Sequence, residues 1–199
     1  MKLMIALLAL LSSLQTFAID TGDFAPDFTL DSAATKNGVV KLSDFKGKIV
    51  VLEWLNHGCP FVRKHYDAGN MQALQKIYVS KNVVWLSVIS SAPGKQGHVS
   101  PQEAREEMVK YKSGATNVLL DPTGKVGLLY EAKTTPHIFV INKEGKLVYQ
   151  GAIDDKPDTD TTSIASAKNY VAEALDLTIA NKPVSQATTK SYGCSVKYK

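Results

Sequence analysis

Apolar residues along this chain gather in short runs that alternate with longer amphipathic stretches. The near-continuous runs at 49–52 and 83–89 have the length and composition of strands covered on both faces of a sheet. A shorter strand is predicted at 117–120. The amphipathic stretches repeat apolar positions at helical spacing; they cover residues 60–78, 100–112, 126–130 and 163–179. This alternation predicts an α/β fold with a mixed central sheet flanked by helices.

Turn residues divide these elements. An Asn-Gly turn at residues 36–38 joins two short strands into an N-terminal hairpin, and the turn at 142–145 joins strands at 137–141 and 146–150 into a second hairpin. Gly69 interrupts the first helical stretch and predicts a kink or break there. Ser100 and Glu103 have the spacing of a capping box that opens the next helix.

The two ends of the chain differ from this globular body. Residues 1–18 carry Lys2, an apolar run and small residues near position 18, a pattern typical of a secretory signal peptide; a retained membrane anchor is the alternative. The body is predicted at residues 19–180. Residues 181–199 are polar and predict a flexible tail that carries Cys194. Export would place the protein in the periplasm or outside the cell, with no stable membrane insertion of the mature chain.

Charge adds little to this picture. The net charge is +4, and loss of residues 1–18 removes one lysine and no acidic residue, which leaves +3. The basic residues are scattered, which argues against a nucleic-acid partner.

The chemistry concentrates where the strand at 49–52 runs into Gly58, Cys59 and Pro60. Gly58 allows a tight turn, and proline suits the first position of a helix, so Cys59 is predicted at the helix N-cap. Unpaired backbone N–H groups and the positive end of the helix dipole favour a thiolate at that position. Nearby side chains would add actual or potential positive charge: His57, Arg63, Lys64 and His65. A buried structural cysteine is the alternative.

The sequence contains two cysteines, Cys59 and Cys194, which lie 135 positions apart. An oxidising compartment would allow them to form one disulfide, but the sequence alone does not decide whether they meet. A flexible tail could deliver Cys194 to Cys59 as a resolving thiol. Alternatively, Cys194 stays free or pairs with another chain.

Three stretches together resemble the redoxin group of the thioredoxin-fold superfamily, which is related to peroxiredoxins. They are the opening Gly22-Asp-Phe-Ala-Pro-Asp-Phe-Thr-Leu30, the strand and turn that end in Cys59, and Thr135-Pro136. The resemblance implies a thioredoxin-like fold with an N-terminal hairpin extension. It also implies that the Thr135-Pro136 bond is cis and lies against Cys59 as a binding platform for substrate; an ordinary trans proline at a strand start is the alternative.

The resemblance assigns one more residue. Thioredoxins bury an acidic residue six positions before the first active-site cysteine, and Glu53 occupies that place here. A carboxyl buried there would have a raised pKa and could accept a proton near the thiol. The alternative is that Glu53 points to an edge of the sheet or pairs with a lysine.

Departures from the family pattern bear on the activity. Val62 stands where thioredoxins have their second cysteine, and Asn56 stands where peroxiredoxins have a threonine. Peroxide reduction is therefore a weaker expectation than disulfide exchange. The single cysteine in a Cys-Pro-Phe-Val turn, with the tail Gly193-Cys-Ser-Val-Lys-Tyr198, resembles a little-characterised peroxiredoxin-like subgroup.

Other features give no site. Four aspartates at 154, 155, 158 and 160 lack the glycine and glutamate of an EF-hand, so a solvated loop is expected. His57 would tune the thiol, contact substrate or bind a soft metal with Cys59; a surface histidine is the alternative. We expect no metal and no cofactor.

The sequence thus predicts an exported thiol-disulfide oxidoreductase with Cys59, Cys194 and Glu53 as catalytic residues and Thr135, Pro136 and His57 at the substrate. Its partners would be protein thiols or disulfides and a thiol reductant that the sequence does not identify. A peroxide-reducing antioxidant protein and a non-catalytic binding or metallochaperone module are the alternatives. The sequence does not indicate the oligomeric state.

Overall fold

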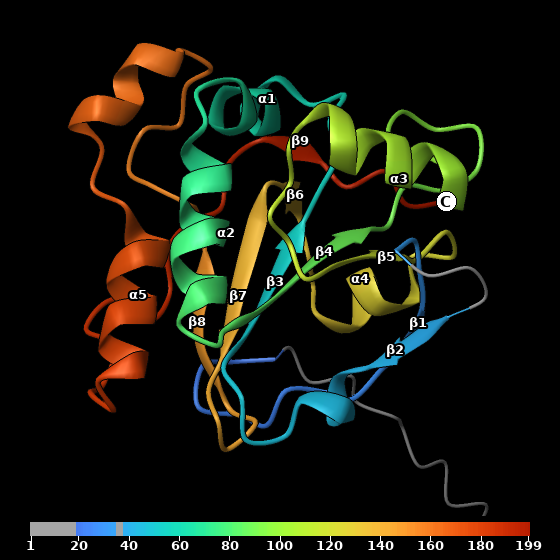
Figure 1. The fold of residues 1–199 in the computed structure, drawn as a ribbon. Coiled ribbons are helices and arrows are strands. Elements are labelled where there is room, and N and C mark those ends of the chain that lie inside the picture. Colours follow the sequence, from blue (N-terminus) through green and yellow to red (C-terminus); the bar gives the residue numbers. More distant parts are fainter. Residues whose placement is uncertain (1–18, 35–37) are drawn as a thin grey trace, which may run out of the picture.

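The computed structural model describes residues 19–34 and 38–199. The predicted signal peptide and most of the first hairpin turn lie outside the described residues. Within them, seven strands form one mixed sheet in the order β2-β1-β5-β4-β3-β7-β8 (Figure 1). Their bounds are β1 Thr29–Ser32, β2 Val39–Lys41, β3 Val50–Trp54, β4 Val84–Ile89, β5 Asn117–Leu120, β7 His137–Ile141 and β8 Leu147–Gly151.

The register confirms the mixed α/β sheet. Strands β3, β4 and β5 are parallel, whereas β7 runs antiparallel to β3 and β1 runs antiparallel to β5. Both predicted hairpins are present, as β1–β2 and β7–β8. Strand β3 lies between β4 and β7, so the turn that follows it leaves from the middle of the sheet.

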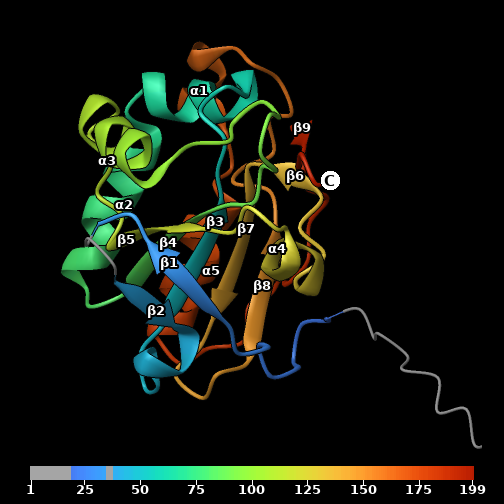
Figure 2. The ribbon, with the colours of Figure 1, turned by 90° about the vertical axis from the view of Figure 1, so that its right-hand side faces the viewer.

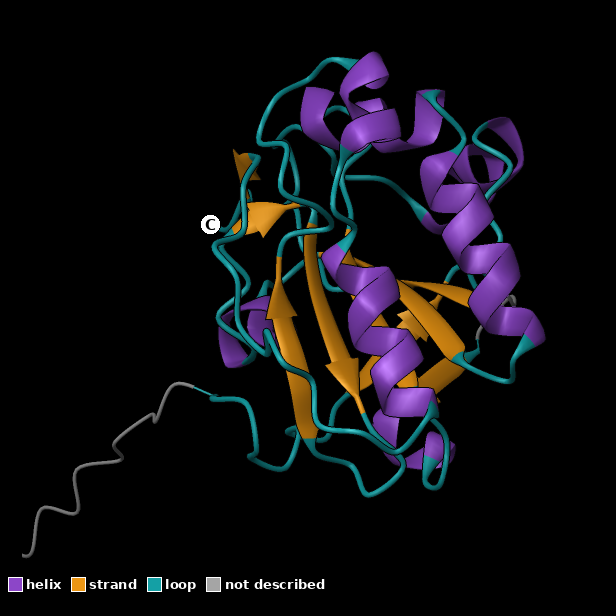
Figure 3. Cartoon of the chain, turned by 90° about the vertical axis from the view of Figure 1, so that its left-hand side faces the viewer, coloured by secondary structure: helices purple, strands orange, loops and turns teal. Residues whose placement is uncertain are grey.

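Alternate residues of β3 belong to two separate cores. Val51 faces the core covered by helices α1 (Pro60–Asp67), α2 (Asn70–Ser80), α3 (Pro101–Lys110) and α5 (Tyr170–Ile179). Leu52 and Trp54 face the second core, beneath α4 (Lys125–Leu129) and the 3₁₀ helix η1 (Leu42–Phe45). Figure 2 shows α4 on the side of the sheet opposite α2 and α3, and Figure 3 shows α2 and α5 across the other face.

The helix boundaries follow local sequence signals, with one exception. Gly69 adopts φ +73° and separates α1 from α2, as predicted, and Ser100 and Glu103 form the expected capping box of α3. The prediction of one helix over 163–179 is wrong at its start. Residues Thr161–Ser166 form a separate 3₁₀ helix, η2, and α5 begins only after Asn169, whose side chain accepts a hydrogen bond from the backbone N–H of Ala172.

The tail, residues 181–199, runs back along the body of the protein. It first follows the edge of β8, where the N–H of Gln150 donates to Ala187 and the N–H of Thr189 donates to Gln150. Its strand β9 (Cys194–Ser195) then pairs with β6 (Thr134–Thr135) in a second sheet (Figures 1 and 2). The flexibility expected for the tail stays a prediction, but its path brings Cys194 to the end of the molecule where β3 runs into α1.

Among the described residues, no helix combines the length and the apolar character that crossing a membrane requires.

Candidate active site

Cys59 occupies the N-cap of α1, as predicted, with Pro60 as the first residue of the helix. Asn56 shapes the preceding turn, because its backbone carbonyl accepts from the N–H of Cys59 at 2.9 Å and its side-chain oxygen accepts from the N–H of Gly58 at 2.8 Å. The loop at 91–99 lies over Asn56 so closely that a Cβ on Gly97 would come within 2.4 Å of its side chain. Cys59 is fully buried, so a partner disulfide reaches it only when a covering segment moves.

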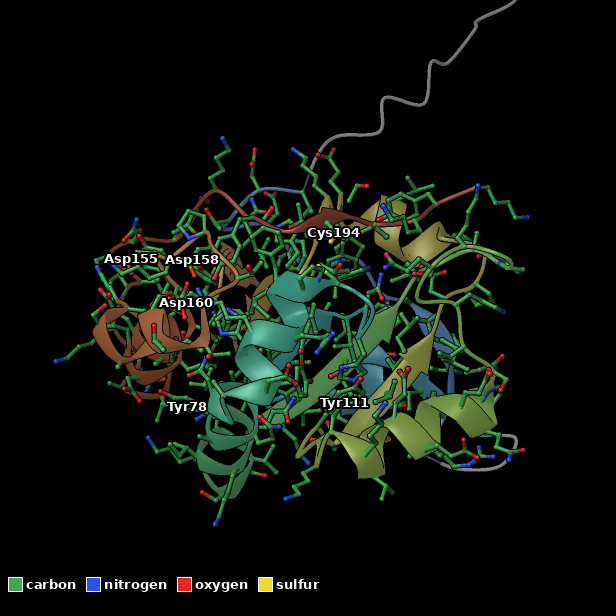
Figure 4. All side chains as sticks on the ribbon, turned by 90° about the horizontal axis from the view of Figure 1, so that it is seen from above. Tyr78, Tyr111, Asp155, Asp158, Asp160 and Cys194 are labelled. Atoms are coloured by element: carbon green, nitrogen blue, oxygen red, sulfur yellow. The ribbon has the colours of Figure 1, made fainter. Side chains whose placement is uncertain are left out.

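That covering segment includes the tail. Strands β6 and β9 pair Thr135 with Cys194, and the backbone N–H of Cys194 donates to Cys59 Sγ at 3.4 Å. Cys59 Sγ also lies 3.0 Å from the carbonyl oxygen of Thr135. Both cysteines are free thiols in this structure. Figure 4 shows Cys194 on the tail strand beside the start of α1.

The surroundings shift the pKa values of the two thiols in opposite directions. Burial raises the pKa of the Cys59 thiol, but hydrogen bonds from the Cys194 side chain, the Val62 backbone, the Cys194 backbone and the Thr135 side chain outweigh burial and lower it below its ordinary value. The sulfur makes no capping hydrogen bond of normal geometry with the first turn of α1. Burial and the proximity of Cys59 raise the pKa of Cys194 to about 11. Of the two thiols, Cys59 therefore ionises more readily and Cys194 holds its proton more tightly.

His57 is not the surface histidine that the alternative interpretation described. Its ring is buried, stacks on Tyr111 with centroids 3.9 Å apart, and meets Tyr66 edge-on. Burial, together with the charge of Lys110, lowers the pKa of His57 to about 4, so the ring is neutral near pH 7. Its Nδ1 has no hydrogen-bond partner among the described residues.

The positive charge expected around the thiol is not among the main causes of the shift in the pKa of Cys59. Arg63 forms an exposed ion pair with Asp67. Lys64 is buried and faces away to Asp158, 3.2 Å from its Nζ. Burial lowers the pKa of His65 to about 4. The prediction failed because successive helix residues point in different directions.

Glu53 is fully buried on β3, which is an interior strand and not an edge of the sheet, and no ion pair with a lysine is found for it among the described residues. Its carboxyl group accepts hydrogen bonds from four side chains at 2.7–3.2 Å: Tyr66, Gln75, Trp85 and Ser87. Burial raises its pKa, and these hydrogen bonds offset only part of that rise. None of the hydrogen bonds found for Glu53 in the described part of the chain reaches Cys59, so a proton-accepting role stays a prediction.

The Thr135-Pro136 bond is cis, as the family resemblance implies. Gly193 of the tail approaches this bond so closely that a Cβ on it would lie 2.1 Å from the carbonyl oxygen of Thr135. Gly193 also has φ +130°, a conformation that favours glycine. The glycine before Cys194 therefore allows the tail strand to reach Thr135.

The aspartate loop is only partly solvated. Asp155, Asp158 and Asp160 lie together at one side of the molecule (Figure 4). Asp154, by contrast, is buried and accepts a hydrogen bond from the hydroxyl group of Tyr192, a tail residue. Sequence reasoning missed Tyr192 because nothing local marks it. Within residues 19–34 and 38–199, no group of three or more His, Cys, Asp or Glu side chains is placed to hold a metal ion.

Comparison with sequence families and curated proteins gives one match. The model of the Redoxin family matches residues 20–169. No curated protein matches the chain.

Solved structures share the fold. An uncharacterised conserved protein from Geobacillus kaustophilus is 27% identical, with a TM-score of 0.76 over 91% of this chain and 93% of that one. A hypothetical protein from Sinorhizobium meliloti 1021 is 23% identical, with a TM-score of 0.76 over 92% and 97% of the two chains. A candidate thiol:disulfide interchange protein, DsbE, from Chlorobium tepidum is 31% identical, with a TM-score of 0.53 over 67% and 85%.

Proposed function

This chain belongs to the redoxin family, and from that premise we propose that it is a thiol-disulfide oxidoreductase whose nucleophile is Cys59 and whose resolving thiol is Cys194. The observation that carries the proposal is the contact between the two cysteines, in which the Cys194 N–H lies 3.4 Å from Cys59 Sγ although 135 positions separate them. The similarity to the Chlorobium tepidum interchange protein supports the same chemistry.

The unequal acidity of the two thiols sets the order of the steps. The Cys59 thiolate attacks a partner disulfide, the partner S–S bond breaks, and the released partner thiolate takes up a proton, which leaves a mixed disulfide on Cys59. Cys194 then loses its proton and attacks Cys59 Sγ, which releases the second partner thiol. The partner gains two electrons and two protons, and the protein is left with a Cys59–Cys194 disulfide that a thiol reductant reopens by the reverse steps.

The remaining site residues have supporting roles in this proposal. Thr135 and Pro136 supply the backbone platform beside Cys59. The buried, neutral side chain of His57 packs beside the turn that leads to Cys59. Glu53 is proposed as a proton acceptor that acts through its hydrogen-bond network. Residues 1–18 are proposed as a signal peptide that exports the protein to the periplasm or beyond, where disulfide partners are available.

The proposal is tested by equilibrating the protein with a series of thiol-disulfide buffers, trapping free thiols and measuring masses. We expect a Cys59–Cys194 disulfide that opens and closes within the series, and that is lost in Cys59→Ser and in Cys194→Ser. Two free thiols across the whole series would refute the resolving role of Cys194. Hydrogen peroxide serves as a second oxidant: a sulfenic acid on Cys59 that forms far faster than on a free thiol would instead favour the antioxidant alternative.

A further inference from the structure

Besides its backbone pairing with β8 and β6, the tail is anchored to the body by side chains, one of which lies close to Cys194 in sequence and touches the helix that carries Cys59. Thr189 bonds Tyr149 and the N–H of Ala152 at 2.7 and 2.9 Å, and Tyr198 donates to the carbonyl of Ala132 at 2.7 Å. Between these anchors, Tyr192 precedes Cys194 by two residues and reaches the cluster formed by α1, the start of α2 and the loop after β8.

The Tyr192 hydroxyl lies between two buried groups. It donates to Asp154 Oδ1, and His65 Nε2 lies 3.1 Å from it. Both Asp154 and His65 have almost no exposed surface. Because burial and the hydrogen bond to Asp154 raise the pKa of Tyr192, its hydroxyl keeps its proton and remains a donor.

The direction of each hydrogen bond can be worked out from the donors available. Asn70 Nδ2, which can only donate, lies 2.8 Å from His65 Nδ1, so Nδ1 accepts and Nε2 carries the hydrogen. His65 Nε2 then donates to the Tyr192 oxygen, and Tyr192 donates to Asp154. This chain requires a neutral imidazole, which agrees with the lowered pKa of His65. Within this chain His65 Nε2 depends on Tyr192 for its partner, whereas Asp154 Oδ1 also accepts from the backbone N–H of Lys156 at 3.0 Å.

The ring of Tyr192 is fixed as well. Phe61, two residues after Cys59, packs on it with ring centroids 5.9 Å apart, and Lys64 Nζ lies 5.9 Å from the ring centre. Lys64 is itself held by the carbonyl of Lys156 at 2.7 Å and by Asp158. Tyr192 is therefore attached to the same short helix that begins at Cys59, so its position fixes Cys194 relative to Cys59.

We propose that Tyr192 is the positioning residue for the resolving thiol, because its contacts with His65 and Asp154 hold the tail so that Cys194 lies against Cys59. A held tail raises the effective concentration of Cys194 at Cys59 and also shields Cys59 from other reagents. The first effect rests on the proposed disulfide exchange; the second does not.

The test removes one hydroxyl and keeps the ring. In the full chain, Tyr192→Phe leaves His65 Nε2 without its partner and removes one of the two hydrogen bonds that Asp154 Oδ1 accepts. We expect the equilibrium constant for the Cys59–Cys194 disulfide to fall about tenfold, the change that losing a hydrogen bond to a charged group produces. Against a glutathione buffer this is a rise in reduction potential of about 30 mV. Tyr78→Phe is the matched control, because it removes a tyrosine hydroxyl that donates to Ala172 on α5, away from the tail.

A second pair of variants tests whether the tail covers Cys59 in protein that cannot form the disulfide. In a Cys194→Ser background, iodoacetamide should alkylate Cys59 several-fold faster when Tyr192→Phe is added, and at an unchanged rate when Tyr78→Phe is added, with circular dichroism showing an intact fold. Equal alkylation with and without Tyr192→Phe would overturn the positioning role. If the wild type forms no Cys59–Cys194 disulfide, the proposed function fails, but the alkylation pair still decides whether Tyr192 holds the tail.

Discussion

At the scale of single residues, the two cysteines differ in acidity mainly because of their burial and hydrogen-bond partners. The main causes of the shift in the pKa of Cys59 are burial, which raises it, and hydrogen bonds from Cys194, Val62 and Thr135, which lower it. The same contact raises the pKa of Cys194, since two neighbouring sulfurs cannot both ionise easily. The ionisation of Cys59 therefore depends on the tail being in place, in addition to the protection from reagents that the tail provides.

This dependence predicts an effect on thiol ionisation. In Cys194→Ala the side-chain hydrogen bond to Cys59 is lost, so the pKa of Cys59 should rise toward the free-cysteine value of about 8.5. The ultraviolet absorbance of the thiolate, followed against pH, measures this. Ser195→Ala, a change at the exposed neighbouring residue, is the control and should leave the titration of Cys59 where it is. A lower pKa for Cys59 in Cys194→Ala would contradict the assignment.

Glu53 predicts a dependence of stability on pH. Its pKa is about 4.5 when unperturbed and is raised in the fold, so between those two values the folded protein keeps a proton that the unfolded chain has released. Within that window rising pH lowers the free energy of unfolding, by up to about 1.4 kcal/mol per pH unit. Below 4.5 the two states bind the proton equally, and the effect disappears.

Glu53→Gln removes this titration and fills the same space. We expect the variant to gain stability relative to the wild type as pH rises through the window, measured by urea unfolding at several pH values. The expected proton-accepting role is read separately, from the rate at which Cys59 reacts with a disulfide. A stability difference that is constant with pH would mean that Glu53 is ionised throughout.

At the scale of elements, local signals were sufficient wherever one short segment decides the structure. The N-cap at Cys59, the break at Gly69 and the capping box at Ser100 are each set by neighbours in sequence. The start of α5 was predicted too early because Asn169 caps the helix inside a stretch of helical periodicity. The cis bond at Pro136 was predictable from family resemblance alone.

Contacts between distant segments could not be read from the sequence. Cys194 meets Cys59 and Tyr192 meets His65 because the tail follows the edge of β8 and then pairs with β6. Nothing in a polar tail indicates its path, since hydrogen bonds to backbone groups need no particular side chain. The four side-chain donors around Glu53 were missed because they come from three other elements, α1, α2 and β4, which only the fold brings together.

The close approach of Gly193 to Thr135 predicts that one added methyl group displaces the tail strand. In Gly193→Ala the added Cβ would meet the Thr135 carbonyl, so we expect β9 to leave β6, Cys59 to become accessible to alkylation, and the Cys59–Cys194 disulfide to form more slowly. Gly22→Ala is a matched control, because Gly22 also has a positive φ, +103°, but an added Cβ there meets nothing within 4 Å. Both variants carry a backbone cost of about 1–3 kcal/mol, and only the first should expose Cys59. Equal protection of Cys59 in both would contradict the close approach.

At the scale of the whole molecule, a Cys59–Cys194 disulfide would tie the tail to the centre of the sheet across 135 positions of chain. The chain-entropy model gives an upper limit of about 5 kcal/mol for such a link. By thermodynamic linkage, the factor by which the disulfide raises the folding equilibrium constant equals the factor by which folding raises the equilibrium constant for forming the disulfide. Because the dithiol form already holds Cys194 against Cys59, the fold needs little rearrangement to close the bond, so folding should favour it.

We therefore expect the oxidised protein to unfold in urea with a free energy about 2–4 kcal/mol above that of the reduced protein. Cys194→Ser supplies the control, since oxidant and reductant should leave its stability the same. A gain near the upper limit, with a reduction potential beyond the reach of thiol buffers, would mark a permanent structural link. A smaller gain with an accessible potential would mark a disulfide that cycles, because a bond that reopens during turnover is one that the fold favours only moderately. An oxidised form less stable than the reduced form would show that closing the bond strains the tail, and would contradict the expectation that folding favours the disulfide.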